Sequence, residues 1–149
     1  MMTGLEPLKI LLVEDDPADQ KLIKASLKNQ KIANDLYIVS SGEEGFEFLY
    51  HQGKYGHETP YPDIILLDLN MPGIGGKEFL RKIKDDESLK QIPVVILTTS
   101  NSEKDILDSY KLQASGYVNK PLSLDEFRNI MEQLEIYWFV ICKRLPKGN

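Results

Sequence analysis

The feature that most limits how this chain can fold is a short apolar run that ends abruptly on a carboxylate. Residues 64–67 are all isoleucine or leucine, Asp68 follows at once, and the chain then turns at Pro72-Gly73. Such a run is typical of a strand covered by helices on both faces. A charge at the tip of a buried strand is unfavourable unless something compensates it. Taken alone, the pattern favours the simpler interpretation of an aspartate that begins a turn at the end of a strand.

The same pattern recurs, because further apolar runs at residues 9–13, 35–39, 92–97 and 116–119 alternate with helical patterns. The expected helices run from Pro17 (capped by Asp16) to about residue 29, through Phe46 to near Gly53, through residues 79–83, from Ser102 and from Ser123. Alternation of this kind predicts an α/β fold: a doubly wound, five-stranded parallel sheet with five helices. With no linker visible, we expect one domain over residues 1–149.

Composition narrows the functional classes. The net charge of −5 argues against non-specific nucleic-acid binding, which needs a basic face. Cys142 is the one cysteine, so an internal disulfide is not possible. No signal peptide is visible, and no apolar run approaches the ~18 residues needed to cross a bilayer; we expect a cytoplasmic protein. His51 and His57 lie in a loop without a third metal ligand at suitable spacing, which favours solvated histidines.

Polar side chains follow four of the expected strands at their carboxyl ends, where ligands bind in doubly wound sheets. They are Glu14, Asp15, Asp68, Thr98 and Lys120. Each alone fits a structural role, but chance would rarely place all five at corresponding strand ends. Clustered carboxylates repel one another, and hard oxygen ligands without His or Cys suit Mg²⁺. Mg²⁺ with a lysine is an arrangement for phosphoryl transfer, with Asp68 as the central nucleophile forming an acyl phosphate.

Four motifs in order make the chain resemble the receiver domain of two-component response regulators, over about residues 8–135. The motifs are Leu12-Val13-Glu14-Asp15-Asp16-Pro17, Leu66-Leu67-Asp68-Leu69-Asn70-Met71-Pro72-Gly73, Val95-Ile96-Leu97-Thr98 and Gly116-Tyr117-Val118-Asn119-Lys120-Pro121. The resemblance implies a flavodoxin-like receiver fold and a signalling protein rather than an enzyme. It also implies that Asp68 accepts a phosphoryl group from the phosphohistidine of a histidine kinase.

By the same resemblance, Asp15, Asp68 and the main-chain carbonyl of Asn70 would bind Mg²⁺, with Glu14 acting through a water. Mn²⁺ or Ca²⁺ could replace it in vitro. Lys120 would pair with the phosphoryl group.

The phosphoryl-binding residues would also include Thr98 and Thr99, the second of which is bulkier than the family's usual residue there. Thr98 and Tyr117 would act as the switch that repacks the face made by helix 4, strand 5 and helix 5. The Lys120-Pro121 peptide bond is expected to be cis.

A closer resemblance involves the loop at residues 53–61, the segment 92–100 and the aromatic stretch 135–139. Together these are similar to single-domain response regulators of cyanobacterial phytochromes, which are light-sensing histidine kinases. The resemblance implies a phytochrome as the kinase partner.

The last helix carries more apolar residues than one buried face can use, and we expect it to extend over residues 136–149 beyond the domain core. Burial against another chain would cover them, which predicts a homodimer. The residues expected at this interface are Ile130, Ile136, Tyr137, Phe139 and Val140.

Three other functions share parts of this pattern. A Mg²⁺-dependent phosphatase with an aspartyl-phosphate intermediate would need a second Asp as general acid where this chain has Asn70. A flavodoxin-like electron carrier would need a phosphate cradle where Glu14-Asp15-Asp16 would repel phosphate. A receiver that is never phosphorylated and serves as a scaffold is the third alternative.

Overall fold

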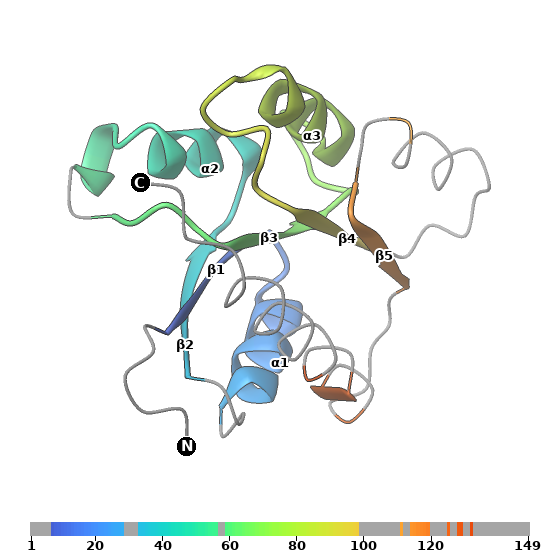
Figure 1. Ribbon diagram of the computed structural model, residues 1–149. Helices are drawn as coiled ribbons and strands as arrows, with labels where there is room; N and C mark the ends of the chain where they lie inside the picture. The colour runs from blue at the N-terminus through green and yellow to red at the C-terminus, as the bar shows by residue number, and fades with distance from the viewer. Residues whose placement is uncertain are drawn as a thin grey trace.

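The computed structural model describes residues 7–28, 33–56, 59–98, 111, 114–119, 125, 128–129 and 132. Its centre is a five-stranded, wholly parallel sheet in the order β2-β1-β3-β4-β5 (Figure 1). The strands are β1 (Leu8–Val13), β2 (Asn34–Val39), β3 (Ile64–Asp68), β4 (Val94–Thr98) and β5 (Gly116–Asn119). The predicted five-stranded parallel sheet is therefore confirmed, and β3 is its middle strand.

Helices cover both faces of this sheet, as Figure 1 shows. α1 (Pro17–Leu27) lies on one face, while α2 (Gly42–Leu49) and α3 (Gly76–Asp85) lie on the other. Asp16 caps α1 as expected, because its Oδ1 accepts a hydrogen bond from the Ala18 N–H at 2.9 Å. The two remaining predicted helices lie almost entirely outside the described residues. Within the described residues, no helix is long and apolar enough to cross a membrane.

The strands are buried on both sides, so alternate residues supply two separate apolar layers. Leu11, Ile65 and Ile96 pack in the layer that contains Phe79 of α3. Their neighbours in sequence point the other way, into the layer that contains Ile23 of α1. This double burial explains why the strands read as continuous apolar runs rather than as alternating patterns.

Element ends differ from the sequence expectation by a few residues, for identifiable reasons. β4 begins at Val94 rather than at residue 92, because Pro93 has no N–H to donate to the neighbouring strand. α1 ends at Leu27 rather than near residue 29. α2 ends at Leu49 rather than near Gly53, and a separate 3₁₀ turn, η1 (Gly53–Tyr55), follows.

His51 accounts for the break after α2, and the expectation of a solvated loop histidine is wrong for it. Its backbone has φ 58°, the left-handed region that a helix cannot use. Its ring is half-buried, and Nδ1 lies 2.8 Å from Thr59 Oγ1 and 3.1 Å from the Gly56 carbonyl oxygen. His51 therefore organises the loop that joins α2 to β3. His57 lies outside the described residues.

Candidate functional site

Three carboxylates meet at the carboxyl edge of the sheet. Val13 pairs with Leu67 in the β1–β3 ladder, so Glu14 and Asp15 leave β1 beside Asp68 at the tip of β3. One carboxylate oxygen from each of the three residues lies within 4.8 Å of the other two. Segments more than 50 residues apart in sequence thus place three like charges in one small volume.

Two of the three side chains are almost removed from solvent. Glu14 is 0% exposed and Asp68 is 5% exposed, whereas Asp15 is the member of the cluster that is open to solvent. The Asp16 N–H donates to Glu14 Oε2 at 3.2 Å, and the Asn70 N–H donates to Asp68 Oδ1 at 3.1 Å. These main-chain donors orient the two buried carboxylates.

The donor set suits a hard divalent cation. It consists of carboxylate oxygens from three residues, without a histidine or cysteine, which matches the preference of Mg²⁺. A bound cation would also relieve the mutual repulsion of the three groups. Glu14, Asp15 and Asp68 therefore fit the metal that the sequence predicts, and their individual roles stay predictions.

Gly76 fixes the helix that follows the site. A Cβ atom at this position would lie 2.5 Å from the Asp68 carbonyl oxygen and 2.5 Å from Leu69 Cα, both backbone atoms. The Gly76 N–H donates to the Leu69 carbonyl at 3.1 Å. Only glycine allows α3 to begin this close to the end of β3. The start of α3 therefore packs directly against the backbone of Asp68 and Leu69.

The sheet register places the end of β4, with Thr98, at the same edge. Asp68 is the partner of Leu97, so Thr98 at the end of β4 comes one residue beyond it. Thr98 in turn pairs with Asn119 at the end of β5. The side chains of Thr98 and Tyr117 are not described, and neither is the expected metal contact of the Asn70 carbonyl. Thr99, Lys120, Pro121 and the five predicted interface residues (Ile130, Ile136, Tyr137, Phe139, Val140) lie outside the described residues.

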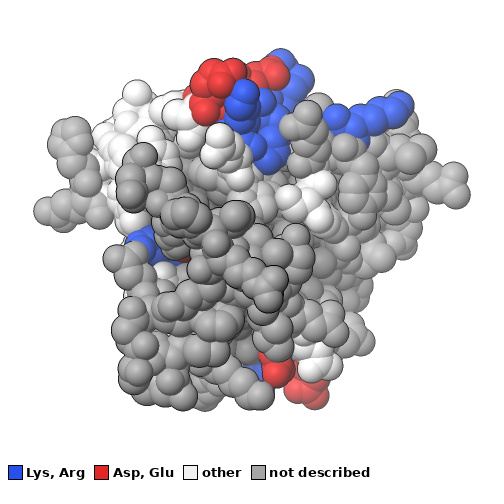
Figure 2. Space-filling view, in the orientation of Figure 1, with Lys and Arg blue, Asp and Glu red and all other residues white. Residues whose placement is uncertain are grey.

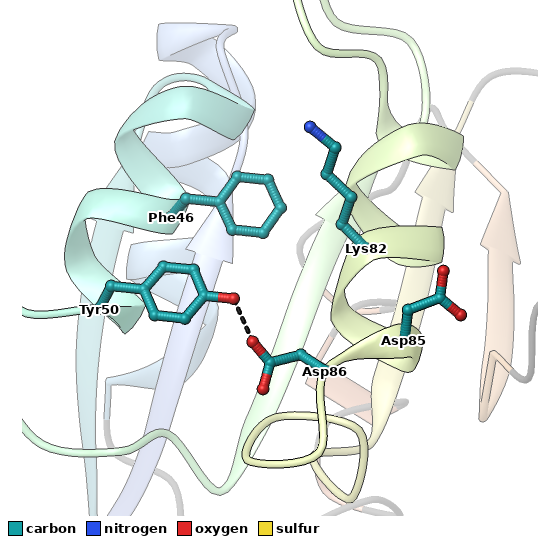
Figure 3. Close-up of a pocket in the computed structure, with 5 residues that line it drawn as sticks. All are labelled: Phe46, Tyr50, Lys82, Asp85 and Asp86. Atoms are coloured by element: carbon teal, nitrogen blue, oxygen red, sulfur yellow. Dashed lines mark hydrogen bonds between the residues drawn. The ribbon is translucent and has the colours of Figure 1, made fainter.

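A second polar cluster lies at the opposite end of α3. Phe46 of α2 and Tyr50, the residue that follows α2, face Lys82 and Asp86 across a pocket of about 390 Å³, also lined by Asp85 (Figure 3). The Tyr50 hydroxyl donates a short hydrogen bond to Asp86 (Figure 3). Burial and this hydrogen bond raise the pKa of Tyr50 to about 12. Because α3 is about 15 Å long, this pocket is separate from the acidic cluster.

Charged side chains of both signs surround that pocket. Figure 2 shows acidic and basic groups side by side over α3 and the turn that follows it. Arg81 is paired with Glu78, and Lys90 Nζ lies 2.9 Å from Glu87 Oε2. This surface is therefore mixed in charge.

Sequence reasoning missed Gln20, a side chain of α1 that contacts the acidic loop. Gln20 Nε2 donates to the Glu14 carbonyl oxygen at 2.5 Å and to Ser40 Oγ at 3.3 Å. A glutamine in the second turn of an amphipathic helix reads as an ordinary exposed residue, so no pattern points to it. By contrast, the run Gly73-Ile74-Gly75-Gly76 could have indicated the close approach of α3.

Comparison with known proteins identifies the family to which this fold belongs. The family model of the response regulator receiver domain matches residues 10–132. The chain therefore belongs to the response regulator receiver family, and its fold is the flavodoxin-like receiver fold.

The similar proteins include response regulators that are named for phytochromes or bacteriophytochromes. The chain is 42% identical over 132 residues to Response regulator Rcp1 of Synechocystis sp., covering 89% of each protein. It superposes on the phosphorylated cyanobacterial phytochrome response regulator RcpA with a TM-score of 0.81 and 40% identity, covering 90% and 95% of the two chains. For the Mn²⁺-bound form of Rcp1 the TM-score is 0.79 at 42% identity, covering 89% and 94%.

Proposed function

We propose that this chain is a single-domain response regulator that accepts a phosphoryl group on Asp68 from a histidine kinase. The observation that carries the proposal is the convergence of Glu14, Asp15 and Asp68 at the carboxyl edge of a receiver fold. Two similar proteins support the proposal. The structure of RcpA is of its phosphorylated form, and the structure of Rcp1 contains Mn²⁺.

In the proposed reaction, an Asp68 carboxylate oxygen attacks the phosphorus of the kinase's phosphohistidine. The new O–P bond forms as the P–N bond breaks, and the bonding electron pair leaves with the imidazole nitrogen. The product is an acyl phosphate on Asp68 and a free histidine on the kinase. Mg²⁺, held by Asp15, Asp68 and the Asn70 carbonyl with Glu14 acting through water, would neutralise charge on the transferring group. Thr98, Thr99 and Lys120 would contact phosphoryl oxygens.

The acyl phosphate would alter the protein through a local change of charge. Thr98 would turn toward the phosphoryl group and Tyr117 would move into the space released, changing the surface made by helix 4, strand 5 and helix 5. Signalling would then proceed by protein contact, including a homodimer formed through the C-terminal helix. We assign the protein to the cytoplasm, where such kinases present their phosphohistidine.

A phytochrome is the proposed kinase partner. RcpA is a cyanobacterial phytochrome response regulator, and AtBRR, a bacteriophytochrome response regulator, matches with a TM-score of 0.74 and 36% identity over 90% of this chain and 96% of its own. A phosphotransfer screen with purified histidine kinases tests this assignment. We expect the fastest transfer from a phytochrome kinase, and faster transfer from a kinase without a light-sensing module would overturn it.

Replacement of the acceptor tests the central proposal. Wild-type protein treated with acetyl phosphate and Mg²⁺, or with a phosphorylated kinase, should gain one phosphate by mass spectrometry. Asp68→Asn should abolish the gain, because an amide oxygen is too weak a nucleophile, and a chelator should do the same. Asp35→Asn, a matched change at an exposed residue of β2, should be labelled like wild type.

Labelling that persists in Asp68→Asn would refute the assignment. Absence of labelling in the wild type, with intact folding, would indicate a scaffold receiver instead. Catalytic hydrolysis of an added phosphate ester would favour the Mg²⁺-dependent phosphatase, although Asn70 supplies no acid there.

A further inference from the structure

Gln20 joins the ends of two strands at the acidic edge. Its Nε2 group donates both to the Glu14 carbonyl at 2.5 Å, just after β1, and to Ser40 Oγ at 3.3 Å, just after β2. The Glu14 N–H donates to the Val39 carbonyl at 3.0 Å, so the same two strand ends are also joined through their backbones. The main chain that carries the acidic pair is therefore held from both sides.

The second anchor, Ser40, is itself held by Glu44 of α2. The Ser40 N–H donates to Glu44 Oε1 at 2.8 Å. The other oxygen of Glu44 accepts from the Tyr55 hydroxyl and lies 3.0 Å from Lys54 Nζ. Tyr55 also packs edge-on against the buried ring of Phe48, with centroids 5.3 Å apart. Tyr55 of η1 is thus connected to the Glu14 carbonyl through three intervening residues, which are Glu44, Ser40 and Gln20.

Glu44 is suited to hold this connection. Partial burial tends to raise the pKa of Glu44, but the hydrogen bonds from Ser40 and Tyr55, together with Lys54, lower it. The carboxylate is therefore charged at neutral pH, and hydrogen bonds to a charged acceptor are stronger than those between neutral groups.

We infer that Gln20 is a positioning residue for the metal-binding acidic pair, and that the η1 turn steadies it through Glu44 and Ser40. The inference rests on the proposed function, since it takes Glu14 and Asp15 as the groups that hold Mg²⁺. Gln20 does not touch the carboxylates. It fixes the backbone from which they project, and Glu14 is fully buried, so a shift of that backbone moves its carboxylate as well.

Replacement of Gln20 by methionine tests the inference. Gln20→Met keeps the length of the side chain and removes the amide donor. The variant loses both hydrogen bonds donated by the Gln20 amide. We expect Mg²⁺ binding to weaken about fivefold, which corresponds to the net free energy of roughly one hydrogen bond. Calorimetric titration with MgCl₂ alone measures this change. Gln91→Met makes the same substitution at an exposed residue of the turn before β4 and should bind Mg²⁺ like wild type.

A spectroscopic readout separates positioning from a general loss of stability. The Asp16 N–H donates to Glu14 Oε2, so its ¹⁵N–¹H resonance reports the placement of Glu14 in the metal-free protein. This resonance should shift in Gln20→Met and in Tyr55→Phe, by less in the second, and should not shift in Tyr61→Phe. The double variant Gln20→Met/Tyr55→Phe should match Gln20→Met alone, because both changes break the same connection.

The outcomes are distinct. If wild-type protein binds no Mg²⁺, the metal part of the proposed function fails. If wild type binds Mg²⁺ and Gln20→Met binds it equally well with an unchanged Asp16 resonance, the positioning role of Gln20 fails while the proposed function stands. Shifts that simply add in the double variant would overturn the link to the η1 turn.

Discussion

Carboxylates lie at both ends of α3, and the two sites differ in the groups that lie next to each carboxylate. At the amino end, Glu14, Asp15 and Asp68 bring three negative charges within 4.8 Å of one another. At the carboxyl end, Asp86 accepts hydrogen bonds from the Tyr50 hydroxyl, the Ser88 hydroxyl and the Ser88 N–H. Those donors lower the pKa of Asp86, so its charge is stabilised by the protein itself.

This difference separates a structural carboxylate from a functional one. A carboxylate whose neighbours are donors contributes to stability and needs nothing further. Carboxylates that lie close to one another, as Glu14, Asp15 and Asp68 do, repel each other, and that arrangement favours a cation. If this distinction is correct, substitutions at the two ends of α3 should have different effects. Substitutions at the acidic edge should change Mg²⁺ binding, whereas substitutions around Asp86 should change only the stability of the protein.

The largest effect on stability is expected where α3 meets the acidic edge. Gly76→Ala introduces a Cβ atom 2.5 Å from two backbone atoms, which must move apart. We expect a loss of about 3 kcal/mol in the free energy of unfolding, at the upper end for overpacking. Because the atoms displaced include the Asp68 carbonyl, Mg²⁺ affinity should fall as well. Urea unfolding and calorimetric titration measure the two effects.

The neighbouring glycine provides the matched control. A Cβ atom at Gly75 would meet nothing within 4 Å, and its backbone has φ −66°, which alanine adopts readily. Gly75→Ala should remain within about 1 kcal/mol of wild type, because it alters only the helix cap. Equal losses in the two variants would show that contact with Asp68 and Leu69 is not what fixes α3.

At the other end of α3, removal of the Tyr50 hydroxyl should affect stability without affecting the acidic edge. Tyr50→Phe leaves Asp86 with its Ser88 donors and should cost about 1 kcal/mol or less, because the tyrosine is 42% exposed. Tyr61→Phe, at a 54% exposed tyrosine, is the control and should change little. A change in Mg²⁺ affinity in Tyr50→Phe would contradict the separation of the two ends.

Burial of Tyr50 and its hydrogen bond to Asp86 together predict that stability depends on pH in the alkaline range. Tyr50 has its pKa raised from 10.0 to about 12, so the folded protein keeps the phenol proton where the unfolded chain would lose it. This contribution to stability is fully present below pH 10 and is lost as the pH rises toward 12. Tyrosinate absorbance followed against pH should show one fewer late-titrating phenol in Tyr50→Phe. A Tyr50 that titrates near 10 would indicate that the bond to Asp86 is not formed.

The sequence predicted the acidic edge better than the surroundings of Asp86, for a physical reason. Apolar runs locate strands, parallel strands align their carboxyl ends, and so Glu14, Asp15 and Asp68 had to meet. The Tyr50–Asp86 bond joins residues 36 apart on neighbouring elements, and its formation depends on how α2 and α3 are packed. Gln20 was missed for the same reason, because its contact with Ser40 depends on the position of α1 over the sheet.

The smallest effect on stability is expected at Glu87, the residue after Asp86, because its ion pair with Lys90 is exposed to solvent. Glu87 Oε2 lies 2.9 Å from Lys90 Nζ, but the two side chains are 87% and 42% exposed. Water competes for both groups, so Glu87→Gln should remain within about 0.5 kcal/mol of wild type, and the difference should shrink further in high salt. Urea unfolding at two ionic strengths measures this. A larger loss of unfolding free energy that does not depend on salt would contradict this prediction. It would mean that an exposed ion pair stabilises this end of α3 in spite of its exposure to solvent.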